Sequence, residues 1–308
     1  MTTAARTSRS TSSGPAVAMV LGAAASVQVG ATAASAMFEA VGAVGAAALR
    51  LLLAAAVMAL LVRPRAWRWT RRQLGLSAAF GAVLAAMNTS FYAALTHVPL
   101  GVAVTCEFLG PLTLSAVLTR RRRDLVWVAL ALAGVLLLGL GGDGEGSRLE
   151  PVGVLLALLA GAFWAGYVLL SARVGAAVPG QGGLAVASVV AGALVLPLGA
   201  AGAGADLLHG HVLALGLVAA LMSSVLPYSL ELVALRRLPE RTFGVLLSLE
   251  PAIAALVGWL LLSQALPATS VLAIAVVVVA SAGATATGER GHVPADPEPL
   301  AHARGRDG

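Results

Sequence analysis

The sequence predicts an all-α integral membrane protein whose ten transmembrane helices form two inverted five-helix repeats. Of its 308 residues, 59% are hydrophobic and only 11% are charged, whereas a soluble domain carries roughly 25% charged residues. The apolar residues form blocks of about 20, the length that crosses a hydrocarbon core of about 30 Å. Arginines gather between alternate blocks, as they do in the cytoplasmic loops of membrane proteins.

Ten apolar blocks follow one another along the chain, and each is predicted to form one membrane span. The predicted spans are 15–37, 41–62, 74–95, 100–118, 125–141, 151–171, 183–203, 212–232, 242–262 and 267–285. Residues 1–14 form a polar cytoplasmic tail, 15–141 the first repeat, 151–287 the second repeat, and 288–308 a disordered cytoplasmic tail rich in Pro, Gly and charge. A cleavable signal peptide is the competing interpretation of the N-terminal region. The apolar run there is longer than a usual signal core, and more spans follow it.

Loop charge predicts the orientation of the spans. One set of alternate loops and tails holds 18 of the 20 arginines, the other set holds only Arg148, and Arg50 lies inside a span. Loops rich in arginine stay in the cytoplasm. We therefore expect a multi-pass protein of the inner or plasma membrane, surrounded by the lipid bilayer, with both termini cytoplasmic. The alternation also supports the number of spans, because one missed helix would disturb it.

The composition excludes several kinds of chemistry. The sequence has no lysine, which rules out a Schiff-base lysine and a Walker-type phosphate loop. Cys106 is the only cysteine, so there is no intrachain disulfide and no cysteine cluster for zinc. The arginines lie between apolar blocks and not on one basic face, so nucleic acid is not an expected partner. Hydrolase and metalloprotease motifs are also absent. We expect no enzyme, no cofactor and no metal site.

The two halves of the chain share a proline frame. Pro99 opens the fourth span and Pro111 follows 12 residues later, while Pro239 opens the ninth span and Pro251 follows 12 residues later. Ala-Leu pairs precede the opening prolines at the same distance. Five spans in each half invert the second half relative to the first, and inverted repeats with interrupted helices are how many secondary transporters build a central site.

Five short motifs point to a known family. They are ALRL at 48–51, NTSFY at 88–92, EFLGPL at 107–112 followed by an arginine run, PYSLE at 227–231 and LEPA at 249–252. In this order and spacing, over residues 16–287, they resemble the EamA-type drug/metabolite transporter superfamily, and especially its threonine/homoserine exporter branch. The resemblance implies ten spans, two EamA repeats and export of amino acids or related metabolites. Ser263-Gln264 departs from the Gly-Glu pair that relatives often carry there.

Four ionisable residues inside predicted spans are candidates for binding substrate or protons. They are Arg50, Glu107, Glu231 and Glu250. A charged side chain at mid-bilayer costs about 2.5–3.5 kcal/mol even on a lenient insertion scale, so such residues normally face a cavity or a partner. Glu231 lies near the cytoplasmic end of its span, where pairing with Arg236 or Arg237 is the alternative.

Glu107 and Glu250 lie close to the second proline of their frames, four and one residues before it. One helical turn separates these positions in the shared frame, so both side chains are expected to line one cavity between the repeats. The free carbonyl before a proline adds a polar backbone group, which suits a substrate ammonium. Our hypothesis is proton-coupled antiport, with Glu107 or Glu250 as the proton carrier. Arg50 would hold a substrate carboxylate or pair with a glutamate. The structural alternative is an ion pair that only locks helices together.

Uncharged polar residues within spans are weaker candidates, because they more often form hydrogen bonds between helices. Asn88, Tyr92 and Tyr228 rank highest, since they belong to the family motifs. Gln28 and Thr105 are further polar residues of this kind.

The leading functional interpretation is a secondary active transporter that exports small polar metabolites, such as threonine or homoserine, driven by protons. The chain has no ATP-binding motif, so a gradient, exchange or the substrate itself must supply the energy. The alternatives are a membrane-embedded enzyme acting on lipid-linked substrates, a multidrug or cation exporter with the same fold, and a structural or sensory membrane protein. A homodimer is compatible with the sequence.

Overall fold

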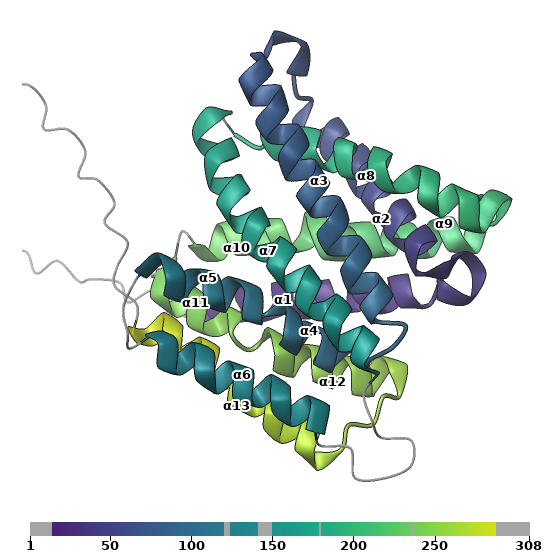
Figure 1. The fold of residues 1–308 in the computed structure, drawn as a ribbon. Coiled ribbons are helices and arrows are strands. Elements are labelled where there is room, and N and C mark those ends of the chain that lie inside the picture. The colour runs from purple at the N-terminus through teal and green to yellow at the C-terminus, as the bar shows by residue number, and fades with distance from the viewer. Residues whose placement is uncertain are drawn as a thin grey trace, which may run out of the picture.

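A computed structural model describes residues 14–119, 124–140, 150–178, 180–235, 237–238 and 240–287. This part of the chain is helical throughout, with short connections (Figure 1). The α-helices are α1 (Gly14–Ser35), α2 (Phe38–Val62), α3 (Arg71–Ala94), α4 (Leu100–Glu107), α5 (Leu109–Thr119), α6 (Asp124–Leu140), α7 (Pro151–Ala177), α8 (Gly182–Ala203), α9 (Gly210–Ala220), α10 (Leu226–Leu235), α11 (Glu240–Leu247), α12 (Glu250–Leu262) and α13 (Ala268–Thr287). Short 3₁₀ turns η1 (Ala66–Arg68) and η2 (Gly204–Leu208) and a π-helical turn η3 (Leu221–Val225) complete them.

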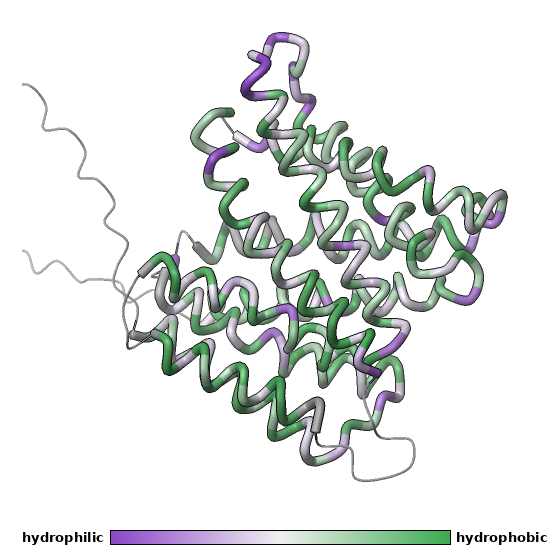
Figure 2. The backbone as a smooth tube through the Cα atoms, viewed as in Figure 1, coloured by the Kyte–Doolittle hydropathy of each residue, from purple (hydrophilic) through white to green (hydrophobic). Residues whose placement is uncertain are grey.

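Helix lengths confirm an all-α membrane protein. Eight helical segments are long and apolar enough to cross a membrane, and two shorter apolar helices lie at Leu125–Leu137 and Gly210–Val225. Within the described residues, these ten segments overlap the ten predicted spans, and the membrane crossing of the two shorter ones stays a prediction. Figure 2 shows hydrophobic residues along the helices and hydrophilic ones concentrated at their ends, most clearly around η1.

The predicted break between the first two spans, residues 38–40 with Glu39 at its centre, lies too late in the chain. The chain turns at Ala36 and Met37, just before Glu39, and Glu39 belongs to the first turn of α2. The partial positive charge of a helix N-terminus stabilises a carboxylate there, so Glu39 can begin a helix instead of separating two. The backbone then bends at Gly42, whose φ of 68° is open to glycine.

Two spans are broken at the predicted prolines. α4 gives way to α5 at Phe108, and α11 gives way to α12 at Ser248 and Leu249. A proline has no N–H for the carbonyl four residues earlier, so Pro111 leaves the Glu107 carbonyl without its helical donor. Both breaks therefore lie beside a glutamate of the sequence motifs.

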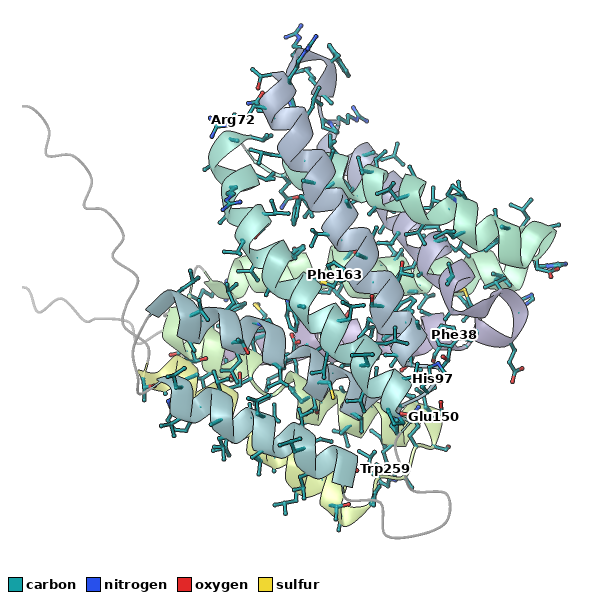
Figure 3. All side chains as sticks on the ribbon, in the orientation of Figure 1. Phe38, Arg72, His97, Glu150, Phe163 and Trp259 are labelled. Atoms are coloured by element: carbon teal, nitrogen blue, oxygen red, sulfur yellow. The ribbon has the colours of Figure 1, made fainter. Side chains whose placement is uncertain are left out.

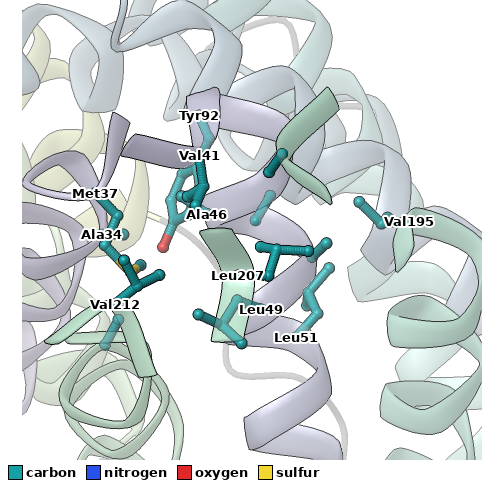
Figure 4. Packing of buried hydrophobic residues seen from close by; sticks show 14 of the residues in the cluster. Ala34, Met37, Val41, Ala46, Leu49, Leu51, Tyr92, Val195, Leu207 and Val212 are labelled. Carbon is teal, nitrogen blue, oxygen red and sulfur yellow. The ribbon is translucent and has the colours of Figure 1, made fainter. Parts of the chain in front are cut away.

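The helices pack as two groups. α2, α3, α8 and α9 form the first group, whose core contains small residues and Tyr92 (Figure 4). α4, α5, α6, α11, α12 and α13 form the second group, in which α6 lies along α13 and α4 crosses α12. α1 and α7 contact both groups. Alanine and glycine at these contacts let helices approach closely, as is usual in lipid.

The end of α12 supplies a first testable prediction. Ser263 caps the helix in the left-handed conformation, with φ 52° and ψ 29°. This conformation costs a residue with a side chain about 1–2 kcal/mol, whereas glycine adopts it freely. We expect Ser263→Gly to stabilise the purified protein by about 1 kcal/mol, measured as a higher melting temperature. Ser171→Gly, within α7, is the matched control and should destabilise it. Equal losses in both variants would contradict the argument.

Candidate functional site

One cavity of about 240 Å³ lies where the two helix groups meet. Its walls come from α1, α2, α3, α4, α7, α8, η3 and α12. Pockets for drug-sized ligands run from roughly 300 to 1,000 Å³, so this one suits a smaller molecule. The lining is largely apolar, and its charged members are Arg50, Glu107 and Glu250. Such a cavity binds a small solute that carries charge.

Arg50 is held in place from several sides. Its Nη1 donates to Ser223 Oγ at 3.0 Å and its Nη2 donates to Asn88 Oδ1 at 2.6 Å. The guanidinium carbon also lies 5.4 Å from the centre of the Tyr92 ring, within the range of a cation–π interaction. Asn88 is itself oriented, because its Nδ2 donates to the Leu84 carbonyl at 2.8 Å. Partners on α3 and η3 therefore fix the position of the positive charge that α2 brings to the cavity.

Two polar groups beside this charge have no hydrogen-bond partner within the described part of the chain. Arg50 Nε and the Tyr92 hydroxyl are buried and, among the described residues, make no hydrogen bond. Tyr92 is only 1% exposed. Buried polar groups in native proteins are nearly always hydrogen-bonded, and an exception requires an explanation. Both residues line the cavity, but these two atoms are enclosed by protein atoms.

The two glutamates belong to the second helix group. Glu107 ends α4 and Glu250 begins α12, and both line the cavity. The charge of Glu107 interacts with those of Glu250 and Arg50. No ion pair joins Arg50 to a glutamate in the described part of the chain; its partners are the amide, the hydroxyl and the ring described above. The predicted pairing of Arg50 with a glutamate is therefore not what the structure contains.

The π-helical turn η3 brings two serines to the cavity. Ser223 accepts the Arg50 hydrogen bond and donates to the Ala219 carbonyl at 2.5 Å, and Ser224 is a second lining residue. α1 supports the turn, since Ser26 Oγ donates to the Met222 carbonyl at 2.6 Å. π-turns inside α-helices are frequent at functional sites. η3 thus places the Ser223 hydroxyl at the candidate site.

Six of the nine residues singled out in the sequence line this one cavity: Gln28, Arg50, Asn88, Tyr92, Glu107 and Glu250. Thr105 is buried away from the lining and donates to the Gly101 carbonyl. The side chains of Tyr228 and Glu231 lie outside the described part of the structure. Within the described residues, no cluster of His, Cys, Asp and Glu is arranged to hold a metal.

Several lining residues were missed by the sequence analysis: Trp164, Tyr167, Ser188, Ser223 and Ser224. For Ser223 and Ser224, the sequence signal that could have identified them is a pair of adjacent serines inside an apolar span. The aromatic residues of α7 gave none, because an aromatic side chain in a span is usually packing.

Fold and site together define a multi-spanning membrane protein with a charged central cavity for a small solute. A family model described as EamA-like transporter family matches residues 151–286. The threonine/homoserine exporter RhtA of Salmonella typhimurium (strain LT2) is 43% identical over 263 residues, which cover 85% of this chain and 88% of that protein. The chain therefore belongs to the EamA-like transporter family. This makes it a membrane transporter, and the alternative of a membrane-embedded enzyme is wrong.

Other relatives support the same membership. RhtA of Escherichia coli (strain K12) is 43% identical over 272 residues, covering 88% of this chain and 91% of that protein. The uncharacterised transporter YwfM of Bacillus subtilis (strain 168) is 32% identical over 166 residues, about half of each chain. A known crystal structure shares the fold, with a TM-score of 0.57 and 20% identity, and covers 91% of this chain and 98% of that one.

Proposed function

We propose that this protein exports small zwitterionic amino acids, with threonine and homoserine as the first candidates, in exchange for protons. The observation that carries the proposal is the charge arrangement in the cavity. A fixed guanidinium comes from the first helix group and two carboxylates come from the second. The named function of the 43% identical relatives supports the same substrate class.

An α-amino acid has complementary charges on one carbon atom. Its carboxylate fits the Arg50 guanidinium, the positive charge of the cavity lining. Its ammonium fits Glu107 and Glu250, which line the same cavity. Charge-assisted hydrogen bonds of this kind are roughly twice as strong as neutral ones. A cationic drug would meet the Arg50 charge and a small cavity, which disfavours the multidrug alternative.

The two glutamates suit different parts of the exchange. A negative charge is stabilised at the N-terminus of a helix and destabilised at its C-terminus. Glu250 begins α12 and Glu107 ends α4, so Glu250 suits a fixed anion and Glu107 suits the proton carrier. A proton on Glu107 would weaken the hold on the ammonium, which links proton entry to substrate release.

The proposal includes two inverted repeats, 15–141 and 151–287, which would rock about the cavity. The contacts between the halves support this, because they pair equivalent spans. α2 packs on α8, the α4 segment on α12, and α6 on α13. Another two contacts are reciprocal. α3, in the third span, packs on α7, in the sixth, and α1, in the first span, packs on α10, in the eighth. A two-fold relation between the halves would produce this pattern.

The proposed orientation keeps both termini in the cytoplasm of a cell with this protein in its inner or plasma membrane. Its support is the distribution of arginine, together with contacts between loops of one predicted side. His97 Nδ1 lies 2.5 Å from Glu150 Oε2, and Figure 3 places the two together at one end of α3 and α7. At the other end, Gln73 Nε2 donates to the Ala177 carbonyl at 2.7 Å. A homodimer stays a prediction.

Efflux from proteoliposomes tests the proposal. Vesicles containing the full chain are loaded with labelled threonine, and release is measured with and without a pH gradient. We expect the pH gradient to stimulate release by the unaltered protein but not by Glu107→Gln. Glu250→Gln should release little threonine under either condition, because it loses the carboxylate that binds the ammonium. Glu39→Gln is the matched control, because Glu39 is exposed and outside the cavity. Equal stimulation in the Glu107→Gln and Glu39→Gln variants would refute the proton carrier. No threonine release from the unaltered protein would refute the substrate class.

A further inference from the structure

One polar side chain at the cavity is not used by the proposed exchange. Gln28, in α1, is 2% exposed and lines the cavity. Among the described residues, none forms a hydrogen bond with its side-chain amide. The one hydrogen bond that involves Gln28 outside the helical ladder uses its backbone carbonyl, which accepts from Thr32 Oγ1. A primary amide with two donors and two acceptor sites is costly to bury without partners. Its place at the cavity indicates that a ligand supplies them.

The contacts of α1 fix where this amide lies. One turn beyond Gln28, Ala31 belongs to the same hydrophobic cluster as Val104 of α4 and Ala254 of α12. These two residues lie one turn from Glu107 and Glu250 respectively, so Gln28 shares a wall with the acidic side of the cavity. The guanidinium of Arg50, which is proposed to bind the carboxylate, comes from α2 instead.

The rotation of α1 about its axis is also fixed. Ser26 Oγ donates to the Met222 carbonyl of η3 at 2.6 Å. A Cβ on Gly30 would lie 3.0 Å from Ser223 N and 3.1 Å from the Ala219 carbonyl, so α1 lies tightly against the backbone there. Ser26 and Gly30 are one turn apart on the same face of the helix. Gln28 and Ala31 therefore keep their places at the cavity.

We propose that Gln28 recognises a hydroxyl group on the side chain of the transported amino acid. This inference rests on the proposed function, which assigns the ammonium and the carboxylate of the substrate to other residues. A hydroxyl group both donates and accepts hydrogen bonds, and a carboxamide has an acceptor and donors to match. An apolar side chain would leave the amide unpaired, and an acidic one would lie near Glu107 and Glu250, where like charges repel. Sites that hydrogen-bond a substrate hydroxyl discriminate strongly against the analogue that lacks it.

The serines of the cavity are the competing recognition groups. Ser188 Oγ donates to the Leu184 carbonyl at 2.9 Å, and Ser223 Oγ donates to the Ala219 carbonyl. Each has thus used its single donor on its own helix. Ser224 is the remaining serine on the lining, and the experiment below includes it.

Threonine and valine distinguish the roles, because they differ by a hydroxyl in place of a methyl group. Export of both is measured with the full chain in proteoliposomes, and kcat/KM is compared for the unaltered protein, Gln28→Met and Ser224→Ala. Methionine keeps the length of the side chain and removes its hydrogen bonds. We expect the threonine-to-valine ratio to fall about tenfold in Gln28→Met and to stay within about twofold in Ser224→Ala. Gln28→Asn, one methylene shorter, should give an intermediate fall.

The possible failures are distinct. An unchanged ratio in Gln28→Met and Gln28→Asn, with threonine still exported, would overturn the role of Gln28 and leave the proposed function intact. A tenfold fall in Ser224→Ala alone would assign the recognition to Ser224 and also overturn it. If the unaltered protein exports neither amino acid, the proposed function fails and this inference fails with it.

Discussion

Replacing Arg50 by methionine is expected to lower kcat/KM for amino-acid export by at least about 30-fold. The variant loses the pair between the guanidinium and the substrate carboxylate, and losing one partner of a buried, hydrogen-bonded charge pair costs about 2–5 kcal/mol. Arg50 touches Ser223, Asn88 and Tyr92 at once, and methionine reproduces none of these contacts. Lysine keeps the charge but lacks the planar fork, so Arg50→Lys should also lose most activity. Initial rates of labelled threonine efflux measure both variants.

Arg68→Met is the control for this experiment. Arg68 is an exposed residue of the η1 turn, far from the cavity lining, and its loss should leave transport near that of the unaltered protein. Size-exclusion profiles and melting temperatures separate a folding defect from a binding defect. An Arg50→Met protein that is folded and keeps an unchanged KM for threonine would show that Arg50 does not bind the substrate.

Replacing Gly110 or Gly161 by alanine is expected to destabilise the protein by about 3 kcal/mol or more, at the upper end of overpacking effects. α5 and α7 touch through bare backbone here. A Cβ on Gly110 would lie 1.8 Å from the Gly161 carbonyl oxygen, and a Cβ on Gly161 would lie 2.5 Å from the Glu107 carbonyl oxygen. Backbone atoms cannot rotate away as the end of a side chain can, so the helices must separate.

Gly175→Ala, also in α7, is the matched control for this prediction. A Cβ on Gly175 meets nothing within 4 Å, and alanine is favoured over glycine within a helix. Melting temperature and the yield of monodisperse protein provide the measurement. Because the backbone of Glu107 packs on Gly161, any Gly161→Ala protein that folds should also have impaired proton coupling. A Gly161→Ala protein as stable as Gly175→Ala would refute this account of the α5–α7 contact.

Much of the fold could be predicted from the sequence, because a few residue types have a large free-energy cost in the wrong place. A long apolar block flanked by arginines has few alternatives to a membrane helix, so the positions of the helices were predictable to a few residues. The breaks at Phe108 and at Ser248 followed from Pro111 and Pro251, since a proline removes a helical hydrogen bond wherever it occurs. The turn before Glu39 was placed too late, because a carboxylate was read as an interruption where it begins a helix.

The site was predictable where the residues are charged. Arg50, Glu107 and Glu250 are costly in an apolar block, and that cost alone marks them. Uncharged groups carry no comparable penalty, so Gln28 and Ser223 could not be separated from ordinary helix–helix contacts. Their role depends on the rotation of α1 and on the π-turn, and both are set by packing between distant parts of the chain.

The π-turn at Leu221–Val225 holds one more residue than an α-turn would. Its extra residue turns every side chain of α10 by roughly 100° from the direction that a continuous helix from α9 would give it. α9 packs against both α2 and α1, whereas α10 packs against α1. Deleting one residue from this turn would bring the two segments into phase, and a single span would then lose its fit to one of its two neighbours.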